Sequence, residues 1–191
     1  MKLLELFSGT KSVSKAVENN FDEIISIDIN DKYKPTILID IMNWDYKIYP
    51  PNYFDVIWAS PPCTEYSILK YGKGNVTEAD KIVKKTLEII NYFNPSKWFI
   101  ENPQTGRLKD RDFMQDLNFY DYDYCSFSDW GYRKRTRIWT NTEQSNELCK
   151  GKNNCPNMIN TRHKKTVADS SANNAYRIPE LLIKRLFNFS E

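Results

Sequence analysis

This chain of 191 residues has only four cysteines, and they are irregularly spaced. Such spacing does not suit the disulfide framework of a small secreted domain, so we expect a reducing, cytoplasmic setting. The apolar run at the N-terminus, residues 3–7, is interrupted by Glu5 and is too short for a signal peptide or a membrane span. The sequence has no internal repeat and no low-complexity segment. These absences favour an ordinary globular protein.

The overall charge of the sequence says little about its partners. The net charge is +2 and the isoelectric point is near 8.2, values that neither require nor exclude a nucleic-acid partner. Hydrophobic residues make up 40% of the chain, which is enough for one domain with a buried core. We therefore predict a single domain over residues 1–191.

Apolar runs and amphipathic periods alternate along the chain. They predict strands at 3–7, 23–27, 36–39, 54–59, 97–100, 122–127 and 135–140, and helices at 11–19, from Thr77 to beyond Ile90, and at 179–187. This order predicts an α/β fold with a Rossmann-like, mostly parallel, doubly wound sheet of seven strands. Residues 141–173 are polar and irregular, and we interpret them as an excursion from the sheet.

The segment Ser60-Pro61-Pro62-Cys63-Thr64 is the most informative part of the chain. It follows an apolar strand, so the thiol lies at the edge of the sheet where open α/β folds bind ligands. The two prolines stiffen the turn. A thiol held in this way suggests a covalent nucleophile, and the alternative is a buried structural cysteine.

Other predicted strands also end in polar residues. Phe7-Ser8-Gly9-Thr10 follows the first strand and holds one glycine, which lets a ligand approach the backbone but is not a dinucleotide fingerprint. Asp28 and Asp40 close the next two strands, and together with the glycine turn they outline a nucleoside site. Glu101 follows the fifth strand, beside Cys63. Each acid taken alone is equally consistent with a solvated loop.

A basic run, Arg133-Lys134-Arg135-Thr136-Arg137, leads into the last predicted strand. Alternate residues of a strand share a face, so Arg133, Arg135 and Arg137 are expected to point together at the ligand. Guanidinium groups suit phosphate or a base edge. A solvated edge strand is the alternative.

In order along the chain, five motifs resemble those of the cytosine-5 DNA methyltransferases. They are Leu6-Phe7-Ser8-Gly9-Thr10, Pro62-Cys63-Thr64-Glu65-Tyr66-Ser67, Glu101-Asn102-Pro103, Arg133-Lys134-Arg135-Thr136-Arg137 and Asn173-Asn174-Ala175-Tyr176-Arg177-Ile178-Pro179. The departures are Thr64 and Tyr66, where the family has Gln and Phe, Pro103 for Val, and Arg133 for Gln. The resemblance covers residues 3–140 and 173–187.

The resemblance implies a class I methyltransferase fold and a DNA (cytosine-5-)-methyltransferase that uses S-adenosylmethionine. The implied catalytic residues are Cys63, Glu101, Arg135 and Arg137, and no metal takes part. The implied cofactor residues are Phe7, Ser8, Gly9, Thr10, Asp28, Ile29, Asp40, Ile41, Pro61, Asn174 and Ala175. DNA contacts are expected from Ser67, Arg133, Lys164 and Lys165.

One departure from the family concerns specificity. Members carry a large target-recognition domain between the arginine motif and the final motif, whereas residues 141–173 here form only a short basic insert. We expect reduced sequence readout, or readout supplied by a partner chain. A bacterial or phage-infected host and a restriction-linked role are plausible by analogy. A tRNA cytosine-5 methyltransferase and an inactive cofactor-binding regulatory subunit remain alternatives.

The insert also contains Cys149, Cys155 and His163. These residues, together with Cys125, suit a small zinc site, and the alternative is free thiols in a polar loop. The spacing lacks a Cys-x-x-Cys pair, so we assign no metal from the sequence.

Overall fold

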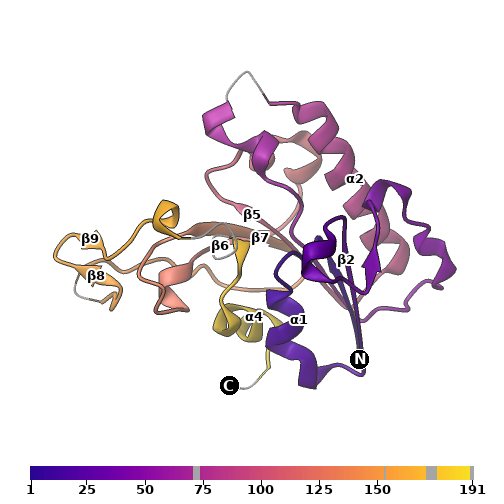
Figure 1. Cartoon of the computed structure of the whole chain (residues 1–191), viewed down its shortest axis with the longest axis horizontal. Helices are drawn as coiled ribbons and strands as arrows, with labels where there is room; N and C mark the ends of the chain where they lie inside the picture. The colour runs from indigo at the N-terminus through magenta and orange to yellow at the C-terminus, as the bar shows by residue number, and fades with distance from the viewer. Residues whose placement is uncertain (71–73, 153, 171–175, 190–191) are drawn as a thin grey trace.

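The computed structural model describes residues 1–70, 74–152, 154–170 and 176–189. Within these ranges seven strands form one sheet, in the order β3-β2-β1-β4-β5-β7-β6, and a hairpin of β8 and β9 projects from its side (Figure 1). The strands are β1 (Lys2–Leu6), β2 (Glu23–Asp28), β3 (Ile37–Leu38), β4 (Val56–Ala59), β5 (Lys97–Pro103), β6 (Phe119–Asp123), β7 (Arg135–Thr140), β8 (Met158–Ile159) and β9 (Arg162–His163). The helices are α1 (Ser12–Val17), α2 (Val76–Phe93) and α4 (Glu180–Phe187).

The first five strands are parallel to one another, and β7 runs antiparallel to both β5 and β6. This sheet confirms the predicted α/β class, with seven mostly parallel strands of Rossmann-like type. Right-handed crossovers between parallel strands place helices on both faces. In the described part of the chain, no helix has both the length and the apolar character that crossing a membrane requires.

Two hydrophobic cores lie on opposite faces of the sheet. Helix α2 covers one face of the sheet, and α1 and α4 cover the other (Figure 1). Leu4 and Leu6 of β1 pack on the α2 side, whereas Leu3 packs with α1 and α4. Strands β1 and β4 are buried on both faces, which explains why their sequences are continuous apolar runs. The two core layers hold the sheet rigid, so the carboxyl ends of its strands stay in place.

Several predicted boundaries need correction. Strand β6 covers residues 119–123 rather than 122–127, because the chain turns out of the sheet at Tyr124 into a 3₁₀ turn. Strand β3 is shorter than predicted, because Thr36 and Ser26 exchange side-chain hydrogen bonds where a ladder would continue. Strand β5 extends to Pro103, and α2 begins at Val76. Asn75 caps α2, since its side chain accepts from the backbone N–H of Glu78.

The only carboxylate in β1 is Glu5, and it is 2% exposed. The backbone N–H of Ser14, 3.1 Å away, and the Ser14 hydroxyl both donate to it. Burial nevertheless raises the pKa of Glu5 from 4.5 to about 7. The sequence shows Glu5 within an apolar run but predicts no role for it, although a lone acid in an apolar strand is a visible signal.

This raised pKa makes stability depend on pH. Between pH 4.5 and about 7 Glu5 keeps its proton in the folded protein but loses it in the unfolded chain. The contribution of Glu5 to the free energy of unfolding therefore falls as the pH rises through this range, and it is constant above it. The difference between the two pKa values of Glu5 corresponds to a loss of about 3 kcal/mol in the free energy of unfolding. Glu5→Gln should therefore be more stable than the parent in urea unfolding at alkaline pH, with the difference vanishing in mild acid. Exposed Glu18→Gln is the control, and a pH-independent difference for Glu5→Gln would contradict the assignment.

Candidate active site

A cavity of about 320 Å³ opens at the carboxyl ends of β1, β2, β4 and β5. The residues predicted from the sequence that line it are Phe7, Ser8, Gly9, Thr10, Asp28, Pro61, Cys63 and Glu101. Parallel strands end at the same edge of the sheet, which is why motifs far apart in the sequence meet here. Additional lining residues include Asn30, Tyr33, Lys134, Tyr176 and Ile178, which the sequence did not assign to the site.

The turn after β1 is held in an unusual backbone conformation. Phe7 has φ of 56° and Gly9 has φ of 45°, both in the left-handed region. The backbone N–H of Gly9 donates to one oxygen of the Asp28 carboxylate at 2.8 Å, and that of Asn30 donates to the other at 2.8 Å. Asp28 thus connects the end of β2 to the glycine turn.

One buried hydroxyl in this turn lacks a partner. Among the described residues, nothing forms a hydrogen bond with Oγ of Ser8, although Ser8 is only 6% exposed. Buried polar atoms are almost always hydrogen-bonded, so an orphan that lines a cavity marks a place for a ligand's polar group.

Cys63 follows the Pro61-Pro62 pair and begins a short 3₁₀ turn, Thr64–Tyr66. Tyr66 is fully buried, and its hydroxyl donates to the Asp80 carboxylate of α2 at 2.9 Å. Arg111 pairs with the same carboxylate at 2.6 Å. The Tyr that departs from the family's Phe therefore has a specific partner, and it fixes the turn that carries the thiol.

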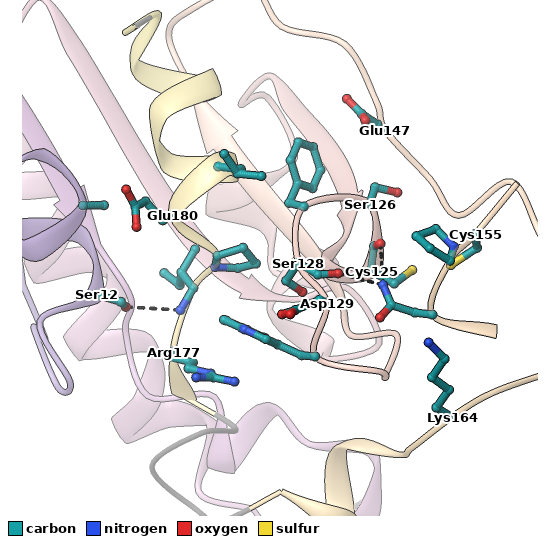
Figure 2. Close-up of a pocket in the computed structure, with 18 of the residues that line it drawn as sticks. Ser12, Cys125, Ser126, Ser128, Asp129, Glu147, Cys155, Lys164, Arg177 and Glu180 are labelled. Carbon is teal, nitrogen blue, oxygen red and sulfur yellow. Dashed lines mark hydrogen bonds between the residues drawn. The ribbon is translucent and has the colours of Figure 1, made fainter. Parts of the chain in front are cut away.

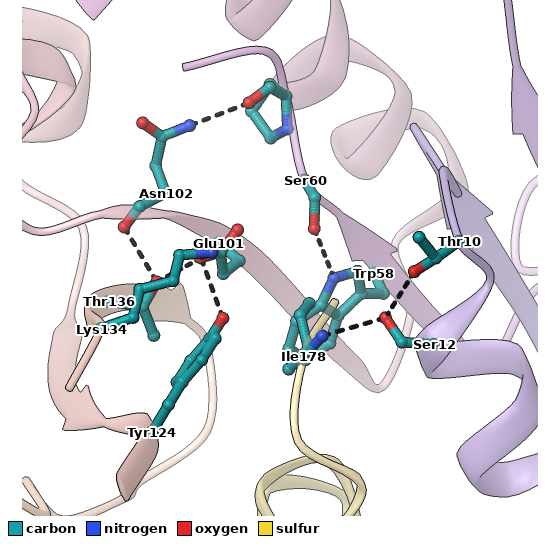
Figure 3. A network of polar contacts seen from close by, with 11 residues as sticks. Thr10, Ser12, Trp58, Ser60, Glu101, Asn102, Tyr124, Lys134, Thr136 and Ile178 are labelled. Atoms are coloured by element: carbon teal, nitrogen blue, oxygen red, sulfur yellow. Dashed lines mark hydrogen bonds and ion pairs between the residues drawn. The ribbon is translucent and has the colours of Figure 1, made fainter. Parts of the chain in front are cut away.

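Several groups from neighbouring segments surround Glu101 of β5 (Figure 3). Its carboxylate is 6% exposed and accepts from the Tyr124 hydroxyl at 3.2 Å and from the Thr136 hydroxyl. The Lys134 ammonium lies 3.8 Å from the same oxygen. The neighbouring Asn102 donates its side-chain N–H to the carbonyl of Pro61 at 2.9 Å, which ties β5 to the cysteine turn.

These surroundings set the chemistry of the thiol. Burial, and then the negative charge of Glu101, raise the pKa of Cys63 above its ordinary value of 9.0, and Lys134 partly offsets the increase. The thiol is consequently protonated at neutral pH. A nucleophile in this position must lose its proton once a substrate has changed its surroundings.

The prediction that the arginines of β7 point at the ligand is wrong for Arg135 and Arg137. They do share a face, but it is the face opposite to Glu101, because strand alternation puts Thr136 on the Glu101 side. Arg135 pairs with Asp123 at 2.7 Å and Arg137 with Asp121 at 2.8 Å, both across to β6. Among the described residues, the cation that lines the cavity is Lys134.

The other residues predicted to bind the cofactor do not line the cavity or lie outside the described residues. Ile29 is 71% exposed, Ile41 is in the core on the α2 side, and Asp40 caps a turn by accepting from the backbone N–H of Met42. In the described part of the chain, these three do not line the cavity. Asn174 and Ala175 lie outside the described residues. The chain just after them does return to the site, since the backbone N–H of Ile178 donates to Ser12 at 3.1 Å (Figure 3).

The predicted nucleic-acid residues lie outside this cavity. Ser67 lies four positions after Cys63, and its hydroxyl accepts from the backbone N–H of Leu69 at 3.3 Å. Arg133, Lys164 and Lys165 are exposed. Arg133 and Lys165 line a second hollow beside β9. Their contacts with nucleic acid stay predictions.

Charge-changing variants at this site should alter the reactivity of the thiol in opposite directions. In Glu101→Gln the pKa of Cys63 falls toward its ordinary value, so alkylation of Cys63 by iodoacetamide at neutral pH should become faster. Lys134→Gln removes the cation that lowers this pKa, and alkylation should become slower. Peptide mass spectrometry follows Cys63 separately from the other cysteines. If both variants changed the alkylation rate of Cys63 in the same direction, that result would contradict the electrostatic explanation.

Known proteins resemble this chain in both sequence and fold. The family model for C-5 cytosine-specific DNA methylase matches residues 1–139. A protein of Frog virus 3 (isolate Goorha), named "Probable DNA (cytosine-5)-methyltransferase", is 40% identical over an alignment of 174 positions, and the match covers 83% of this chain and 79% of the viral protein.

Two solved structures share the fold at low sequence identity. The Entamoeba histolytica methyltransferase EhMeth is 18% identical with a TM-score of 0.56, over 94% of this chain and 63% of that one. A variant of Spodoptera frugiperda DNMT2 is 17% identical with a TM-score of 0.53, over 81% of this chain and 57% of that one. The chain thus spans less than two thirds of the length of these structures. On the family match and the viral relative, it belongs to the C-5 cytosine-specific DNA methylase family, whose enzymes are DNA cytosine-5 methyltransferases.

Proposed function

We propose that this chain transfers a methyl group from S-adenosylmethionine to carbon 5 of cytosine in DNA, through a covalent adduct on Cys63. The observation that carries the proposal is one continuous cavity that Cys63 and Glu101 share with the Phe7–Thr10 turn and Asp28. A nucleophile and a nucleoside-binding turn in one cavity suit a reaction between a bound cofactor and a base.

The residues at one end of the cavity fit this cofactor. The unpartnered hydroxyl of Ser8 is available to a polar group of the ligand, and Asp28 keeps lone pairs for ribose hydroxyls after accepting two backbone N–H groups. Apolar surface for a methionine chain and a purine comes from Phe7, Pro61 and Ile178. When bound, S-adenosylmethionine supplies a methyl group on a positively charged sulfur.

The other end of the cavity fits a cytosine ring. The Cys63 thiol loses its proton to solvent, and its Sγ atom forms a bond to carbon 6. The double bond between carbons 5 and 6 breaks, which makes carbon 5 nucleophilic. Glu101 shares a proton with ring nitrogen 3 and accepts a hydrogen bond from the amino group, and so stabilises the negative charge that develops on the ring. After methylation a base removes the proton from carbon 5, the sulfur–carbon bond breaks, and the free thiol returns.

The placement of the cations at the start of β7, and of Lys134 just before it, changes the roles implied by the family motif. Lys134, 3.8 Å from Glu101, takes the position beside the base that the motif implies for an arginine, and its charge favours the Cys63 thiolate. Arg135 and Arg137 instead hold β6 against β7 through Asp123 and Asp121. They are positioning residues in this proposal.

A trapped covalent complex tests the proposed chemistry. DNA that carries 5-fluorocytosine should form a stable adduct with the native protein, because fluorine cannot leave carbon 5 as a proton. Cys63→Ser should form none, and Glu18→Gln, which changes an exposed residue outside the cavity, should keep the adduct. Trapping that persists in Cys63→Ser would exclude Cys63 as the nucleophile. Preferential trapping by 5-fluorocytosine in tRNA would move the substrate from DNA to RNA.

The proposed cofactor contact can be measured separately. Asp28→Ala should weaken S-adenosylmethionine binding about tenfold or more in calorimetry, because losing a buried hydrogen bond costs about 1–3 kcal/mol. Asp45→Ala is a matched control, since Asp45 accepts from the backbone N–H two residues on, as Asp28 does, but is exposed and outside the cavity. Equal affinities for the two variants would remove Asp28 from the site.

Target readout in this proposal is sparse. Residues 141–173 are too few for a separate recognition domain, and their basic side chains suit phosphates, which position a duplex without reading it. The methylated context should then be short, unless a partner chain adds base contacts. The target cytosine must leave the stack to reach Cys63.

A further inference from the structure

We propose that Cys125, Cys149, Cys155 and His163 bind one zinc ion, which fastens the basic insert to the edge of the methyltransferase sheet. Nothing in the Cys63 chemistry requires this site, so the proposal stands independently of the proposed function. The four candidate ligand atoms, three sulfurs and a ring nitrogen, all lie within 4.8 Å of one another.

The distances fit a tetrahedral ion. The Sγ atoms of Cys149 and Cys155 each lie 3.6 Å from Nε2 of His163. A tetrahedral zinc with Zn–S of about 2.3 Å and Zn–N of about 2.0 Å places sulfur and nitrogen about 3.5 Å apart. Three thiolates and one imidazole form a complete structural zinc set, with no position open for catalysis.

The four ligands come from separate segments, and each segment is held by its own contacts. Cys125 lies in the 3₁₀ turn after β6, and its carbonyl accepts from the Asn157 side chain at 2.9 Å. The backbone N–H of Cys149 donates to Asp123 at 2.9 Å. Cys155 follows a turn at Gly151, and His163 lies in β9. Figure 2 shows Cys125 and Cys155 close together at one end of a cavity of about 860 Å³.

The insert lacks other means of stabilisation. Among the described residues, neither hydrophobic core includes any between 141 and 170. The regular structure of its described residues is two strands of two residues each and one 3₁₀ turn, Val167–Asp169. Ile159 on one of the strands is 61% exposed. A segment of this kind buries too little apolar surface to pack stably, and a metal is a common substitute for a core.

The charge around the cluster also suits a metal. Zinc with three thiolates and a neutral imidazole has a net charge of −1, and Arg133 lines the hollow beside Cys149 and His163. Arg162 and Lys165 line the same hollow. A zinc ion at this place would therefore also fix the orientation of three basic side chains.

Metal analysis of the full chain tests the proposal. After expression with zinc and dialysis, the parent protein should hold one zinc per chain. The zinc content of His163→Ala and of Cys149→Ser should be lower by about tenfold or more, because each variant removes a ligand. Cys63→Ser is the matched control and should keep its zinc, since Cys63 lies in the other cavity. Zinc content far below one in the parent, or equal loss in all three variants, would overturn the proposal.

A second readout does not depend on how the variants fold. Cobalt added to the metal-free parent should give thiolate charge-transfer absorption and the visible bands of a tetrahedral site. Stripping the metal should make residues 141–170 sensitive to protease while residues 1–139 stay resistant. Absence of the cobalt spectrum, or a disulfide among Cys125, Cys149 and Cys155 in freshly isolated protein, would show that the cluster is not a metal site.

Discussion

The geometry of the active site depends on the burial of one carboxylate at the end of β5. Glu101 lies among Tyr124 of the turn after β6, Lys134 just before β7, and Thr136 of β7 itself. A buried carboxylate without such donors would be costly, so this cluster couples the antiparallel end of the sheet to its parallel half. Asn102 extends the coupling to the proline turn through Pro61. The position of the thiol therefore depends on the whole centre of the sheet.

Strand register decides which charged side chains reach the cavity. Glu101 lies opposite Ile138 in the β5–β7 ladder, and Thr136 and Lys134 follow on the same side. Arg135 and Arg137 consequently lie on the other side of β7, where they pair with Asp123 and Asp121. One side of β7 serves the site, and the other holds β6, whose end carries Tyr124 and Cys125 toward their partners.

The sequence predicted the parts of the site that depend on local order. Asp28 ends a predicted strand, and Gly9 and Cys63 lie in the turns that follow two others, so the strand pattern alone places them at one edge. The roles of Arg135 and Arg137 could not be derived in this way, because they depend on the face that an antiparallel strand turns to the cavity. Asp80 and Arg111 were missed because their link to Tyr66 joins segments far apart in the chain. The cluster of Cys125 with Cys149, Cys155 and His163 was left undecided, since its spacing matches no short motif.

Tritium release measures the central claim, attack at carbon 6 followed by methylation of carbon 5. DNA labelled with tritium at carbon 5 of cytosine would be incubated with S-adenosylmethionine and the purified chain, and methyl incorporation counted alongside tritium in water. A covalent mechanism through Cys63 predicts one tritium released for each methyl group transferred, and neither event in Cys63→Ser. Methyl transfer that leaves the tritium on the base would place the methyl group elsewhere on cytosine and contradict the account.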